Sequence, residues 1–220
     1  MKRSFTKRLW YNGLRVIFRM AAVVVFRVRC EGRRHIPHEG SLLVLSNHQS
    51  HLDPIMVGLA FDRRLNYVAR ESLFRFAPLR WFIRSLDAIS IDLEGSPLGG
   101  LKETLKRLKH DEAVLIFPEG TRSVDGRVAP FRLGYATLAR RAHATILPVA
   151  VEGTFDALPR QHLFPRPAVI QVHIGAPIWP DEIDQLADVQ LEQEVRRRIT
   201  DCHAQAIDGR RRRDTDFTRG

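Results

Sequence analysis

The sequence predicts an α/β fold: a single domain in which a largely parallel β-sheet is flanked by helices. From residue 41 onward, short apolar runs such as LLVLS and AVLIF alternate with amphipathic segments, which is the repeated strand and helix pattern of a buried parallel sheet. The chain has 220 residues and 44% hydrophobic content, which is enough for one substantial core and too little for two.

The individual elements follow from the same alternation. Strands are expected at residues 42–46, 65–69, 88–91, 113–117 and 145–152, with two more near 24–30 and 168–174. Helices are expected at residues 54–61, 72–86, 98–110 and 132–142, with a closing helix at 190–207. Polar clusters directly follow the first and fourth of the main strands. Since ligands of such sheets bind beyond the carboxyl ends of the strands, the functional site is expected there.

Residues 1–29 are expected to form a basic amphipathic segment at a membrane interface. Helical periodicity over residues 7–25 creates two opposite faces. The apolar face consists of Trp10, Leu14, Ile17, Ala21 and Val24, and the basic face consists of Arg8, Arg15 and Arg19. The longest uncharged run, MAAVVVF, has seven residues, far below the roughly 20 that cross a bilayer. Arginines also interrupt any signal-peptide core. We expect an interfacial helix with its arginines toward anionic headgroups, and the alternative is a helix that caps the protein's own core.

The net charge of +10 is concentrated at the two ends of the chain. Residues 1–35 hold ten Lys and Arg against Glu31 alone, and residues 196–220 hold eight Arg against four Asp, which leaves about −3 for residues 36–195. A nucleic-acid module would carry its positive charge on the folded face, so no nucleic-acid partner is expected. Residues 209–220 are expected to form a disordered basic tail.

The remaining residues, 30–208, are expected to form the folded domain that carries the polar clusters. The two cysteines, Cys30 and Cys202, have neither metal-ligand spacing nor a disulfide framework, which fits a reducing compartment. Together with the basic N-terminal segment, this predicts a protein associated with the cytoplasmic face of a membrane that carries anionic lipids.

The stretch NHQSHLDP, residues 47–54, predicts a helix start with Asp53 as the N-cap and Pro54 as the first helical residue. On a continuous helix, His48 and Asp53 would lie about 140° apart and could not bond. A turn before Pro54 can instead fold the carboxylate back onto the imidazole, which fixes the tautomer and leaves the other ring nitrogen as a general base. The chain has no GxSxG elbow and Ser50 lies too close to His48 for a serine triad, so the proton to be removed would belong to the substrate.

A second cluster, FPEGTRS at residues 117–123, has the composition of an anion site. Gly120 permits close approach of the backbone, Arg122 can bind a phosphate through two hydrogen bonds, and Glu119 can accept a hydroxyl or hold the arginine. A polar loop with a surface salt bridge is the alternative interpretation of this cluster.

In order and spacing, NHQSHLD, FPEGTRS and ILPVAVEG (residues 146–153) resemble motifs of the glycerolipid acyltransferase family, typified by 1-acylglycerol-3-phosphate acyltransferases. PFRLGYATLA at residues 130–139 is similar to the stretch that follows in that family. The resemblance implies that His48 and Asp53 are the catalytic pair and that the loop with Glu119, Gly120, Thr121 and Arg122 binds the acceptor. It also implies an acyl-CoA or acyl carrier protein thioester as co-substrate, a lysophospholipid acceptor, and neither a metal nor another cofactor.

The second motif of that family is where this sequence departs from the pattern. The chain reads DAISIDL, with Asp87, Ser90 and Leu93 where the family has glycine, usually phenylalanine, and an arginine that is taken to grip the acceptor phosphate. The thioester chemistry does not depend on this motif, whereas the acceptor does. Lysophosphatidic acid, another lysophospholipid and another hydroxylated or amino lipid therefore remain open as acceptors.

Two other functions are compatible with these residues. A metal-dependent hydrolase would use His48, His51 and Asp53 as ligands, although their HxxHxD spacing lacks the usual metal-site patterns. A membrane-surface lipid-binding protein would keep the fold but would not catalyse a reaction. The presence of both His48 and Asp53 argues against this alternative.

Overall fold

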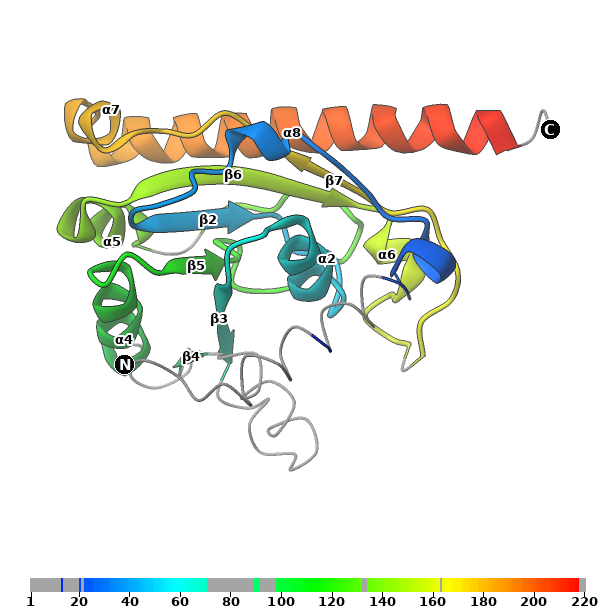
Figure 1. The fold of residues 1–220 in the computed structure, drawn as a ribbon, viewed down its shortest axis with the longest axis horizontal. Helices are drawn as coiled ribbons and strands as arrows, with labels where there is room; N and C mark the ends of the chain where they lie inside the picture. Colours follow the sequence, from blue (N-terminus) through cyan, green and yellow to red (C-terminus); the bar gives the residue numbers. More distant parts are fainter. Residues whose placement is uncertain are drawn as a thin grey trace.

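A computed structural model describes residues 13, 20, 22–70, 89–91, 98–131, 134–162 and 164–217. Within them, one sheet has the strand order β1-β7-β6-β2-β5-β3-β4 (Figure 1). The strands are β1 Arg29–Glu31, β2 Leu42–Ser46, β3 Leu65–Arg70, β4 Ile89–Ile91, β5 Ala113–Ile116, β6 Thr145–Glu152 and β7 Gln171–Ile174. The five strands from β6 to β4 are mutually parallel, β7 is antiparallel to β6, and β1 is parallel to β7. The predicted largely parallel sheet is confirmed.

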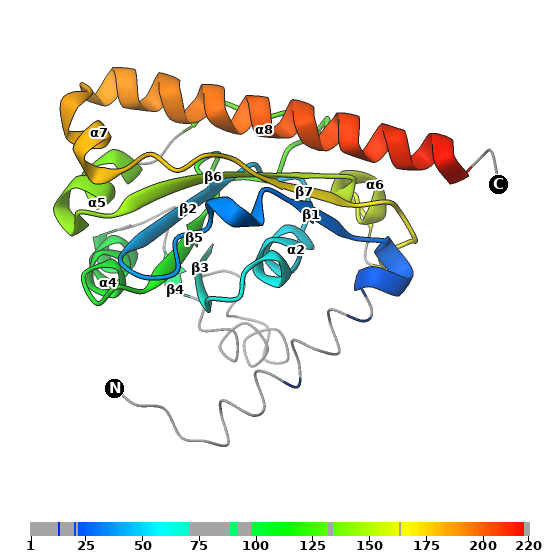
Figure 2. The ribbon, with the colours of Figure 1, turned by 45° about the horizontal axis from the view of Figure 1, so that its top comes forward.

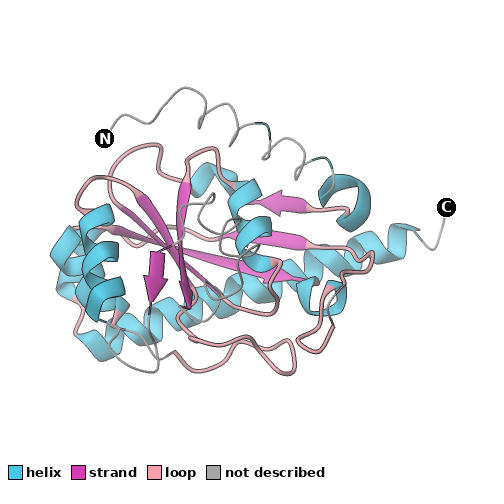
Figure 3. Ribbon diagram, turned by 90° about the horizontal axis from the view of Figure 1, so that it is seen from below, coloured by secondary structure: helices cyan, strands magenta, loops and turns pink. Residues whose placement is uncertain are grey.

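Helices cover both faces of this sheet (Figure 2). They are α2 Asp53–Ala60, α4 Leu98–Leu108, α5 Tyr135–Ala142, α6 Thr154–Ala157, α7 Pro180–Gln185 and α8 Asp188–Phe217, with a 3-10 helix, η1, at Arg33–His35. α4, α5 and α8 pack on one face, whereas α2 and residues 22–26 pack on the other. Figure 3, which views the sheet from the side opposite α8, shows α8 running behind the strands.

β2 lies at the centre of the sheet and all five of its residues are buried. Leu42 and Val44 join the core on the α2 face, and Leu43 and Leu45 join the core on the α8 face. Side chains alternate between the two faces of a strand, so a strand covered on both sides must be apolar throughout. This is why LLVL is a continuous apolar run, and it fixes the position of the polar residues that follow.

The strand expected near residues 24–30 is confirmed only in its last part. Residues 22–26 are helical, and β1 begins at Arg29. Ala22 and Phe26, four positions apart, are buried against the core, so helical periodicity outweighs the β-propensity of the valines between them. Those valines are exposed. Most of the amphipathic helix expected over residues 7–25, and the whole helix expected at 72–86, lie outside the described residues.

The prediction of a disordered tail over residues 209–220 is wrong for residues 209–217, which extend α8. The Arg210 guanidinium pairs with Glu152 Oε1 at 2.8 Å and with Asp156 Oδ2 at 2.5 Å. Arg213 donates to the backbone oxygen of Arg27. Two of the arginines that suggested a solvated tail therefore bind acceptors on the folded domain, and the helix continues along the sheet to reach them. No helix in the described part of the chain is long and apolar enough to cross a membrane.

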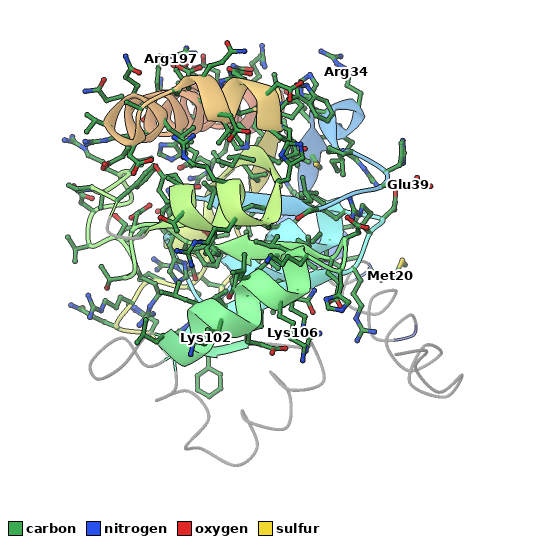
Figure 4. All side chains as sticks on the ribbon, turned by 90° about the vertical axis from the view of Figure 1, so that its left-hand side faces the viewer. Met20, Arg34, Glu39, Lys102, Lys106 and Arg197 are labelled. Atoms are coloured by element: carbon green, nitrogen blue, oxygen red, sulfur yellow. The ribbon has the colours of Figure 1, made fainter. Side chains whose placement is uncertain are left out.

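We expect Arg210→Ala to lower the free energy of unfolding by about 1 to 3 kcal/mol, because hydrogen bonds between charged groups are worth about that much where they are partly buried. The Arg210 side chain is 20% exposed. The matched control is Arg197→Ala on the outward side of the same helix (Figure 4), where the side chain is 59% exposed and pairs with Glu194 and Asp201. Exposed pairs contribute less than about 1 kcal/mol. Urea denaturation measures both losses, and equal losses would show that Arg210 does not anchor the end of α8.

Candidate active site

The two polar clusters of the sequence meet at one edge of the sheet. β2 and β5 are parallel neighbours, and each cluster begins just past the carboxyl end of its strand (Figure 1). The backbone N–H of Ser123 donates to the backbone oxygen of His48 at 2.7 Å, and the N–H of His48 donates to Glu119 Oε1 at 3.0 Å. The loop of residues 117–127 therefore holds the backbone of His48 from both sides.

Asn47 fixes the start of the first cluster against β6. Its side-chain amide donates to the backbone oxygen of Val151 at 2.9 Å, and its Oδ1 accepts the Val151 N–H at 2.8 Å. The side chain thus continues the strand pairing beyond the last residue of β2, while the backbone turns away into the site. Asn47 is buried, and its role was not predicted from the sequence, although its place directly after a strand was the available signal.

His48 and Asp53 form the contact that the turn before Pro54 was expected to allow. His48 Nδ1 lies 2.8 Å from Asp53 Oδ2, the carboxylate is fully buried, and the imidazole is 17% exposed. Because an ionised carboxylate can only accept, the Nδ1 atom carries the proton and the lone pair lies on Nε2. The imidazole also stacks on Phe117, with ring centroids 4.1 Å apart. The arrangement presents a fixed neutral base at the edge of the sheet.

The N-cap role predicted for Asp53 is wrong. Asp53 is the first residue of α2, and no side chain caps that helix. Its Oδ2 instead accepts the N–H groups of Gln49 at 2.6 Å and Ser50 at 2.7 Å, in the turn that precedes the helix. Its Oδ1 accepts the hydroxyl of Thr154 at 2.5 Å. The carboxylate therefore organises the turn that carries His48, and the free N–H groups of α2 are not its partners.

The contacts of Asp53 also argue against the alternative function as a metal-dependent hydrolase. Both oxygens of Asp53 already accept hydrogen bonds from protein donors inside the core, so the carboxylate has little capacity left for a cation. Among the described residues, no group of three or more His, Cys, Asp and Glu side chains could hold a metal ion.

Glu119 lies beneath the histidine turn and does not point outward. It is 1% exposed, its Oε1 accepts the His48 N–H, and its Oε2 has no hydrogen-bond partner in the described part of the chain. Burial raises the pKa of Glu119 to about 7, against the opposing effect of the His48 N–H. The surface salt bridge that was the alternative for this loop is therefore not formed by Glu119, and its carboxyl supports the base.

The other residues of this loop lie nearer the surface. Gly120, Thr121 and Arg122 are half-buried, and the Gly120 N–H closes a turn onto the backbone oxygen of Phe117 at 3.0 Å. Desolvation, followed by the positive charge of Arg122, lowers the pKa of His51 to about 4. The guanidinium of Arg122 therefore lies close enough to act on the histidine turn. Of the departing family positions, Asp87 and Leu93 lie outside the described residues, and Ser90 lies in β4.

A third polar cluster, which the sequence did not reveal, lies next to the histidine turn and contacts Gln49. Glu152 at the end of β6 accepts from His203 Nε2 at 2.9 Å, from Gln49 Nε2 at 3.0 Å and from Arg210 Nη1 at 2.8 Å. Burial raises the pKa of Glu152, but these donors outweigh burial and lower it to about 2. The available signal was the place of Glu152 in ILPVAVEG, at the same edge of the sheet. His203 and Arg210 come from α8, which no local pattern links to this edge.

The comparisons with known proteins agree with this geometry. The family model described as Acyltransferase matches residues 27–152. The 1-acyl-sn-glycerol-3-phosphate acyltransferase alpha of Mus musculus is 31% identical over 171 residues, which are 74% of this chain and 60% of that protein. The chloroplastic 1-acyl-sn-glycerol-3-phosphate acyltransferase BAT2 of Brassica napus is 27% identical over 74% of this chain and 48% of its own length. The chain thus spans less than two thirds of either relative.

The fold has a counterpart among solved structures. The crystal structure of the 1-acyl-sn-glycerophosphate (LPA) acyltransferase PlsC from Thermotoga maritima superposes with a TM-score of 0.77 at 25% identity, covering 91% of this chain and 81% of that one. The matched family region, residues 27–152, runs from the start of the sheet through β6 and contains both His48 and the loop that supports it. The chain belongs to the acyltransferase family.

Proposed function

We propose that this protein transfers a fatty acyl group from an acyl-CoA or acyl carrier protein thioester to a hydroxyl of a lysophospholipid such as 1-acylglycerol-3-phosphate. The observation that carries the proposal is the pairing of His48 Nδ1 with the buried carboxylate of Asp53 at 2.8 Å, at the edge of the sheet where ligands bind. The names of the relatives support the same reaction.

The chemistry needs no group beyond the chain and its two substrates. His48 Nε2 accepts the proton of the acceptor hydroxyl while the hydroxyl oxygen forms a bond to the thioester carbonyl carbon. The resulting imidazolium is stabilised by Asp53 through Nδ1. When the C–S bond breaks, the thiolate leaves and takes the proton from Nε2, which gives the free thiol and returns His48 to its neutral form. Neither a covalent acyl-enzyme nor a metal takes part in these steps.

The acceptor is proposed to bind over the loop of residues 117–127. Arg122 is half-buried and its positive charge acts on the histidine turn, so it can hold a phosphate close to the base. Glu119, which lies below, fixes the turn through the His48 N–H and does not contact the acceptor.

Membrane association is the second part of the proposal. Met20, Val23 and Val24 are 63%, 57% and 73% exposed, and Met20 projects from the periphery of the molecule (Figure 4). Ala22 and Phe26 of the same segment are buried in the core, so one side of the segment anchors it and the other presents apolar surface. With the excess of Lys and Arg in residues 1–35, this favours insertion into the interface of an anionic membrane, at its cytoplasmic face.

We expect His48→Ala to lower the acyl-transfer rate by on the order of 10² to 10⁴, the usual worth of a positioned general base. Asp53→Asn should also be severe, because an amide cannot stabilise the imidazolium. The control is His110→Ala, a histidine exposed at the end of α4. The assay incubates radiolabelled acyl-CoA or acyl carrier protein with a panel of lysolipids and resolves the products. A folded His48→Ala protein that retains the wild-type rate would exclude His48 as the general base. No acyl transfer by the wild-type protein to any lysolipid of the panel would instead favour lipid binding without turnover.

The wild-type protein should lose stability as the pH rises, and we expect the Glu119→Gln variant not to show this loss. Glu119 releases its proton near pH 7 in the folded chain, above its ordinary value of 4.5. The folded state therefore holds an extra proton between these values, and the wild-type protein loses stability as the pH rises from about 4.5 through about 7. Glutamine does not titrate, yet its oxygen can still accept the His48 N–H.

The measurement is thermal melting of both proteins between pH 4.5 and pH 8, with exposed Glu39→Gln as the control (Figure 4). The Glu119→Gln variant should gain stability relative to the wild type toward the alkaline end of this range, whereas the control should follow the wild type. A constant offset across the range would contradict the raised pKa of Glu119.

We expect Val24→Glu to weaken binding to vesicles that contain anionic lipid, because a carboxylate would be placed on the apolar surface that inserts. The control is Val189→Glu at the start of α8, where the valine is similarly exposed, at 65% against 73% for Val24. Co-sedimentation with vesicles measures the bound fraction. Equal binding by the two folded variants would show that residues 20–25 do not form the membrane contact.

A further inference from the structure

The two oxygens of the Asp53 carboxylate have separate sets of partners. Oδ2 faces the histidine turn and accepts from His48 Nδ1 and from the N–H groups of Gln49 and Ser50. Oδ1 faces the opposite way and accepts the hydroxyl of Thr154 at 2.5 Å. Asp53 and Thr154 are both 0% exposed, so water cannot replace the hydroxyl. The orientation of the carboxylate is thus set by contacts on both of its sides.

The direction of the Thr154 hydrogen bond follows from its surroundings. Thr154 Oγ1 also lies 3.2 Å from Gln49 Oε1. The Gln49 amide nitrogen lies 2.7 Å from the backbone oxygen of Gly126 and 3.0 Å from Glu152 Oε2, so both of its protons have acceptors and the oxygen must face Thr154. The hydroxyl therefore lies between two acceptors, and its single proton belongs on the nearer, charged oxygen of Asp53.

The backbone places Thr154 there through a turn that only glycine allows. Gly153, directly after β6, has φ +92°, and a Cβ at this position would lie 2.1 Å from the backbone oxygen of Val169. α6 begins at the next residue, where β6 ends in Figure 1, and brings the hydroxyl to the carboxyl edge of the sheet. The contact joins residues 101 positions apart.

We infer that Thr154 is a positioning residue of the active site, whose hydroxyl holds the Asp53 carboxylate in the rotation that presents Oδ2 to His48. The inference rests on the proposed function and adds a residue to it. The torsion of a carboxylate about its Cβ–Cγ bond is broad, so the backbone of Asp53 does not fix it alone. Without the hydroxyl, Oδ1 is buried without a donor, and the carboxylate gains by rotating toward the N–H groups of the turn, away from His48 Nδ1.

Thr154→Val tests this inference because valine keeps the shape of threonine and removes the hydroxyl. We expect kcat to fall by roughly tenfold, with the KM values of both substrates unchanged, since the lost interaction acts on the base and not on binding. Thr154→Ser should restore most of the rate. The matched control is Thr104→Val in α4, where the buried hydroxyl donates to the backbone oxygen of Gly100 at 2.8 Å. It should lose stability without losing kcat.

A second measurement needs no substrate. In protein labelled with ¹⁵N-histidine, the Nδ1 proton of His48, assigned by its absence in His48→Ala, should exchange with water faster in Thr154→Val than in the wild type, Thr154→Ser or Thr104→Val. If Thr154→Val keeps the wild-type kcat or the wild-type exchange rate, the inference is wrong. If the wild-type protein transfers no acyl group to any lysolipid, the proposed function is wrong instead, and the exchange measurement still decides the role of Thr154.

Discussion

A carboxylate that is fully removed from water must recover its lost hydration from protein donors, and Asp53 does so with groups from two parts of the chain. The turn after β2 supplies two backbone N–H groups and the imidazole, and the start of α6 supplies a hydroxyl. Each donor restricts the position of the segment that carries it. The position of His48 is therefore a consequence of the hydrogen bonds that the buried Asp53 carboxylate requires. The strand order places β2 beside β6, so that the turn after β2 and the start of α6 can both reach this carboxylate.

The same requirement extends the active site to the end of the chain. Gln49, which donates its N–H to Asp53, also contacts Glu152, a half-buried acid at the same edge. Glu152 in turn takes donors from His203 and Arg210 of α8. The helix that closes the fold thus contributes packing through one part of its length and charge compensation through another. This explains why α8 continues past the last residue that packs against the core.

The sequence predicted what local periodicity determines. The strands at residues 42–46 and 145–152 are correct at both ends, because burial on both faces makes them continuous apolar runs with polar residues at their limits. The predictions from sequence were wrong where a contact with a residue distant in the chain determines the conformation. The Asp53 side chain was predicted to cap its helix, yet it turns toward donors before it. The arginines of the tail were predicted to be solvated, yet Arg210 meets an acid that lies 58 residues earlier. The same holds for Thr154, which nothing in its neighbourhood marks as a partner of Asp53.

The loop of residues 117–127 positions the backbone of His48 and also carries Arg122, which restricts the sequence changes that the loop can accept. It holds the N–H of His48 through Glu119 and the backbone oxygen of His48 through Ser123, and between these two contacts it carries Arg122. Placement of the base and the proposed acceptor contact thus lie on one short stretch of backbone. An insertion or deletion between residues 119 and 123 would alter both at once. If Arg122 holds the acceptor as proposed, side-chain exchange at Thr121 and Arg122 offers a route to new acceptor preferences that leaves the length of this loop unchanged.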